Sequence, residues 1–149
     1  MDRSALLAST VCFLVGFVLS VQNLRARVYR PSRWSFFAAS GGFLLQTVWL
    51  SQRGRELGRC PLSSLFDVLV FLGWSVALLY LLTGATYRMS LLGVFSSPLV
   101  FLLQMVALWL PVPLVTKASG PVNFWLELHA AVSVVAYGAF ALAGIAGVT

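Results

Sequence analysis

The chain has 149 residues, of which 60% are hydrophobic and only 9% are charged. This composition excludes an ordinary soluble domain, in which about 25% of residues are charged. The formal net charge of +6 does not indicate nucleic-acid binding, because the basic residues fall in short segments between apolar blocks, where lysine and arginine set membrane topology.

Five apolar blocks are long enough to cross a bilayer as helices. In chain order they are Ala5–Val21, Phe36–Leu50, Leu62–Leu82, Leu91–Leu110 and Leu128–Val148. The second block is short, and Trp34 and Ser51 can extend it. We therefore predict an all-α fold, a polytopic transmembrane helical bundle of about five spans in the lipid bilayer, with residues 1–149 as a single transmembrane domain.

The segment after the first block carries the densest positive cluster of the chain, Arg25, Arg27, Arg30 and Arg33. Such a cluster favours the cytoplasmic side of the membrane. Basic residues over all the loops divide equally between the two sides, so the first loop alone favours an extracytoplasmic N-terminus. The chain ends at Thr149, directly after an apolar block and without a charged flank. From this ending we expect the front part of a longer protein.

The second and third blocks each contain polar residues with a structural interpretation. Gly41 and Gly42 let neighbouring backbones approach closely, and Gln46 is best interpreted as a buried side chain that makes one interhelical hydrogen bond. Ser64 and Asp67 have capping-box spacing at the start of the third block, where a carboxylate also suits the helix dipole. Asp67 therefore has two open interpretations, a helix cap or a functional carboxylate.

The chain has a single histidine, His129, at the start of the fifth block, with Trp125 four residues before it. Ser133 and Tyr137 follow at helical spacing and share one face with it. A neutral imidazole with aromatic and apolar walls suits a haem iron, and cations such as Arg59 suit the propionates. A lone histidine at a helix end is more often a snorkelling or hydrogen-bonded residue. The residues alone leave both interpretations open.

Two segments resemble the CcsA-like family of membrane proteins that assemble cytochrome c in system II. The segment from Gly58, GRCPLSSLFDVLVFLGW, resembles the family's G-x-x-P-L-S-N-L-Y-E-S-L-x-F-L-x-W stretch, with Phe66 and Asp67 in place of Tyr-Glu. The later segment WLELHAAVSVVAYGAF resembles the family's W-L-x-x-H-V-S-x-x-x-x-S-Y-A stretch. The matching positions there are Trp125, Leu126, His129 and Tyr137.

The resemblance implies a role in cytochrome c biogenesis, in which haem is bound and presented at the outer face of the membrane for attachment to apocytochrome c. It implies a plasma (inner) membrane protein with an external N-terminus, and His129 as the axial metal ligand. Trp125, Tyr137, Asp67 and Arg59 are the other cofactor-binding residues that we predict.

The family's W-x-W-D segment and second external histidine do not occur in these 149 residues. We therefore expect an incomplete haem site, and a chain that forms the N-terminal part of a larger assembly domain. A second assembly subunit is a further predicted partner. We assign no catalytic residue, and no enzyme activity to this chain alone.

Two alternatives remain at this point. The first is a HemX-type relative, a membrane regulator of haem biosynthesis without haem-attachment activity. The second is a transporter bundle in which Asp67 and His129 relay protons. The transporter alternative requires another ionisable group close to Asp67, and the sequence shows no obvious one.

Overall fold

The structure is a computed structural model that describes residues 3–25, 33–87, 90–112 and 123–148. These residues form five helices and no strand. The helices are α1 (Ser4–Arg25), α2 (Arg33–Leu57), α3 (Leu65–Tyr87), α4 (Ser90–Trp109) and α5 (Phe124–Val148). Each contains most of one predicted apolar block, and the predicted all-α helical bundle is confirmed.

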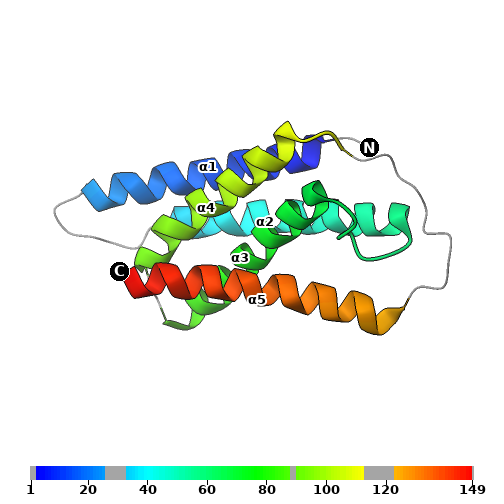
Figure 1. Ribbon diagram of the computed structural model, residues 1–149. Helices are drawn as coiled ribbons and strands as arrows, with labels where there is room; N and C mark the ends of the chain where they lie inside the picture. The colour runs from blue at the N-terminus through cyan, green and yellow to red at the C-terminus, as the bar shows by residue number, and fades with distance from the viewer. Residues whose placement is uncertain (1–2, 26–32, 88–89, 113–122, 149) are drawn as a thin grey trace.

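The helices run alternately up and down the bundle (Figure 1). The chief neighbours are α1 with α2, α3 with α4, α1 with α4, and α3 with α5. Helix α5 lies at the edge of the bundle and packs mainly against α3. As a result, the start of α5 lies at the same end of the bundle as the end of α2 and the start of α3.

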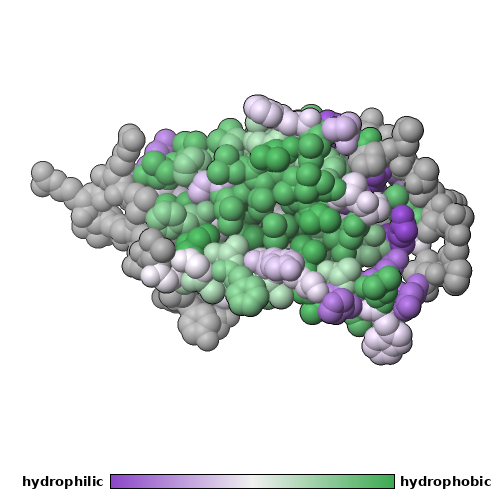
Figure 2. Space-filling model, viewed as in Figure 1, coloured by the Kyte–Doolittle hydropathy of each residue, from purple (hydrophilic) through white to green (hydrophobic). Residues whose placement is uncertain are grey.

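Among the described residues, four helices are long and apolar enough to cross a membrane, and α2 is not one of them. Helix α2 differs because its buried residues include Ser35, Gln46 and Arg53. It contacts α1, α3 and α4, which shield this polar side from the surroundings. Figure 2 shows an apolar band across the viewed face, with polar residues gathered toward one end. The chain is a multi-pass membrane protein.

Helices α1 and α2 approach closely at Gly42. A Cβ atom added there would lie 2.9 Å from Cε2 of Phe13 and 3.2 Å from Cβ of Cys12. The hydroxyl of Ser9 also donates a hydrogen bond to the Gly42 carbonyl, at 2.8 Å. The predicted close approach is confirmed at Gly42, whereas Gly41 faces open space.

Buried amides join the helices in the middle of the bundle. Gln46 Nε2 donates to the Val70 carbonyl at 2.8 Å, which confirms the predicted interhelical bond between α2 and α3. On α4, Gln104 accepts from Thr10 at 2.8 Å and donates to Ser9 at 3.2 Å. These bonds fix the relative height of the helices, because an apolar contact alone has little preference along the helix axis.

Candidate functional site

The start of α3 is built around the buried carboxylate of Asp67. Its Oδ1 atom accepts from Nε of Arg53 at 3.1 Å, and both side chains are fully buried. Its Oδ2 atom accepts from the hydroxyls of Ser63 and Ser64, at 3.0 and 2.8 Å. The Asp67 amide donates back to Ser64 Oγ at 3.1 Å, so the Ser64 side chain caps the first turn of α3.

These contacts support the interpretation of Asp67 as a residue that stabilises the start of α3. Its part in cofactor binding stays a prediction. The contacts also reveal Arg53 as an ionisable group beside Asp67, a neighbour that was not obvious from the sequence. Arg53 lies within α2, and a charged group is stable there because Asp67 neutralises it.

The loop between α2 and α3 approaches the start of α5. Gly58 ends α2 with a positive φ of 67°, a conformation that glycine adopts without steric cost. Arg59 follows and is exposed. The Cys60 amide then donates to Oε2 of Glu127 on α5 at 3.1 Å. Burial, and secondly the negative charge of Glu127, raise the pKa of the Cys60 thiol above its ordinary value of 9.0.

The first turn of α5 is capped by Asn123. Its Oδ1 atom accepts from the amides of Trp125 and Leu126 at 3.1 and 3.4 Å. His129 follows one turn after Trp125, and its side chain is exposed. The hydroxyl of Ser133 donates to the His129 carbonyl at 2.8 Å, so this side chain makes its hydrogen bond within its own helix.

His129 faces away from the helices that α5 packs against. The packed side is marked by Gly138, where an added Cβ would lie 3.1 Å from Cβ of Ser75 on α3. His129 precedes Gly138 by nine residues, which at about 100° per residue is half a turn round the helix. Trp125 and Tyr137 are 75% and 65% exposed. The outer side of α5 therefore carries an imidazole flanked by aromatic side chains.

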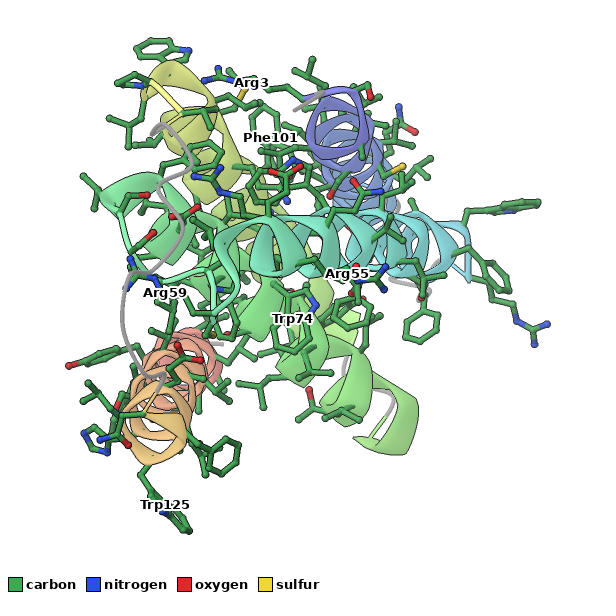
Figure 3. All side chains as sticks on the ribbon, turned by 90° about the vertical axis from the view of Figure 1, so that its right-hand side faces the viewer. Arg3, Arg55, Arg59, Trp74, Phe101 and Trp125 are labelled. Carbon is green, nitrogen blue, oxygen red and sulfur yellow. The ribbon has the colours of Figure 1, made fainter. Side chains whose placement is uncertain are left out.

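The structure brings some of the predicted site residues together and separates others. His129 and Trp125 are neighbours one turn apart on α5. In Figure 3, Trp125 projects from α5 away from the bundle and away from Arg59. Asp67 is enclosed by its own partners. Within the described ranges, no group of three or more histidine, cysteine or acidic residues is placed to hold a metal ion. The role of His129 as a metal ligand stays a prediction.

Comparison with known proteins identifies the family of this chain. No family model and no solved structure matches the chain. The cytochrome c biogenesis protein CcsA of Chlorella vulgaris is 31% identical over 144 residues, which cover 90% of this chain and 45% of the relative. The protein of the same name from Gloeobacter violaceus is 32% identical over 117 residues, which cover 74% of this chain and 34% of the relative. The chain belongs to the CcsA-like family.

A third relative, the CcsA protein of Nostoc punctiforme, is 31% identical over 101 residues, which cover 64% of this chain and 28% of the relative. The CcsA-like chain thus spans less than half the length of these relatives. All three are named for cytochrome c biogenesis, and none favours the HemX alternative.

Proposed function

We propose that this CcsA-like chain takes part in cytochrome c biogenesis by binding haem and presenting it at the outer face of the membrane, where it is attached to apocytochrome c. The observation that carries the proposal is the match, over 90% of the chain, to a protein named for cytochrome c biogenesis. The exposed single histidine supports it, because an exposed imidazole at a helix end is accessible to iron.

In this proposal His129 would ligate the haem iron, and Trp125 would form an aromatic wall one turn away. Tyr137 extends the aromatic surface along α5, and Arg59 pairs with a propionate. Haem, when bound, supplies the iron that the imidazole ligates and is itself the group handed on to the apocytochrome. Asp67 contributes indirectly, since its contacts hold the start of α3 and the loop that carries Arg59.

The residues present fit one side of a haem. A planar group against the outer side of α5 needs a second wall and a second axial ligand, and the described residues show neither. Because the chain covers 45% of the Chlorella vulgaris relative, we propose that residues 1–149 are the N-terminal part of a larger assembly domain. The rest of the site then comes from a segment that corresponds to the remainder of the relatives, on the same chain or on a second subunit.

The same proposal places the chain in the plasma (inner) membrane with an extracytoplasmic N-terminus. The end of the bundle that contains the starts of α1 and α5 is then external, and His129 lies at the outer surface. The first-loop arginines support this orientation, although Arg27 and Arg30 lie outside the described residues.

Haem content after purification tests the ligand assignment. His129→Ala should lose most of the haem that co-purifies with the wild-type chain, measured by absorbance and by extraction of the pigment. Gln52→Ala is the control, because Gln52 is an exposed polar residue on α2. Equal haem content in wild type and His129→Ala would exclude His129 as the ligand.

A further inference from the structure

We infer that Glu127 is a positioning residue that latches the first turns of α5, residues 124–133, to the loop of residues 58–64. The latch fixes the direction in which His129 faces. The latch is a feature of the fold, whereas its importance for haem rests on the proposed function.

The first turn of α5 has few other attachments. Phe124, Trp125 and Leu126 are 65%, 75% and 66% exposed, so they pack little against the other helices. In this part of α5, as far as the structure describes it, the hydrogen bond from the Cys60 amide to Glu127 joins the helix to another element. The close approach to α3 at Gly138 comes about three turns later. The latch therefore holds a helix end that packing alone leaves weakly held.

The loop on the other side of the latch is itself fixed. Gly58 sets its beginning through its left-handed backbone. The buried pair of Arg53 and Asp67, with the serine hydroxyls bonded to Asp67, sets its end. A carboxylate that accepts from an amide of such a loop is held in place as well, because bonds to charged groups are among the stronger hydrogen bonds in proteins.

Helical geometry converts this contact into a direction for His129. Glu127 precedes His129 by two residues, so the two side chains leave the helix about 200° apart. While Glu127 is bonded to the loop, the imidazole points to the opposite, outer side of α5. If the latch opens, the outer end of α5 is free to rotate or fray, and His129 loses its fixed direction.

Hydrogen–deuterium exchange of the whole chain in detergent tests the latch without haem. In Glu127→Ala, we expect amide exchange of residues 58–64 and 124–133 to rise about tenfold, the factor expected from losing a hydrogen bond to a charged group. Glu127→Gln keeps an acceptor oxygen and should restore exchange to near the wild-type rate. Glu56→Gln, an exposed acid on α2, is the matched control and should exchange as wild type. Unchanged exchange in either segment of Glu127→Ala, or no restoration by Glu127→Gln, would overturn the latch.

Haem titration of the same variants tests the positioning of His129. If wild type binds haem through His129, Glu127→Ala should weaken binding about tenfold and alter the absorption spectrum of the bound haem, and Glu127→Gln should restore both. Wild-type affinity and spectrum in Glu127→Ala would overturn the positioning role. A wild-type chain that binds no haem would refute the proposed function, while the exchange experiment would still decide the latch.

Discussion

The buried pair of Arg53 and Asp67 gives the sharpest stability prediction. In Asp67→Ala the guanidinium of Arg53 stays fully buried and loses its carboxylate partner. Removing one member of a buried ion pair typically costs about 3 to 5 kcal/mol. We expect that loss for Asp67→Ala. Arg53→Met should cost less, because the Asp67 carboxylate keeps the hydroxyls of Ser63 and Ser64 as donors.

The pair is tested by a double-mutant cycle. Asp67→Ala together with Arg53→Met removes both charges, and we expect the double variant to be more stable than the sum of the two single changes predicts, by at least about 2 kcal/mol. The assay is unfolding in mixed micelles, followed by tryptophan fluorescence, with Glu56→Ala as an exposed control that should leave stability unchanged. Additive single losses, or a loss below about 1 kcal/mol for Asp67→Ala, would refute the reasoning.

Three further predictions concern separate parts of the bundle. Gly42→Ala should lower the free energy of unfolding by about 1 to 3 kcal/mol, because the added methyl group crowds the contact of α1 with α2. Gly41→Ala meets open space and should leave it unchanged in the same unfolding assay. Gln104→Leu should lower the free energy of unfolding by about 1 to 3 kcal/mol, because two hydrogen bonds to α1 are lost. A smaller loss would show that the amide contributes little to the stability of the bundle. Because the pKa of Cys60 lies above 9.0, its alkylation in a Cys12→Ser background should be slower at pH 8 than that of a free thiol. The alkylation rate of Cys60 should still increase with pH above pH 9.0. A rate that becomes constant below pH 9.0 would contradict the raised pKa.

Sequence patterns predicted the features of this fold that depend on neighbouring residues. Block length predicted the helices, and the spacing of Ser64 and Asp67 predicted the cap. The amide of Gln46 predicted an interhelical bond because a buried amide in a membrane bundle needs a partner. The exception to the predicted spans is α2, which forms the expected helix but is less apolar than the other four.

The features that the sequence could not predict depend on contacts between distant residues. Arg53 resembles a loop residue until α3 brings Asp67 to within 3.1 Å. Glu127 bonds an amide 67 positions earlier in the chain, and no local pattern contains that pairing. The shared face of His129 and Tyr137 was predictable from helical spacing, but its outward direction depends on how α5 docks on α3 and on the contact of Glu127 with the Cys60 amide.

The polar character of α2 has a consequence for how the protein enters the membrane. Helix α2 carries Gln46 and, near its C-terminal end, Arg53 on its buried side, and charged side chains in membrane helices are costly unless they are paired. Such a segment is poorly retained by lipid when it emerges alone from the translocon. Its close contact with α1 at Gly42 offers a way in as a helical hairpin, and Asp67 then neutralises Arg53 once α3 follows. We therefore expect insertion of α2 to depend on the helices made before and after it.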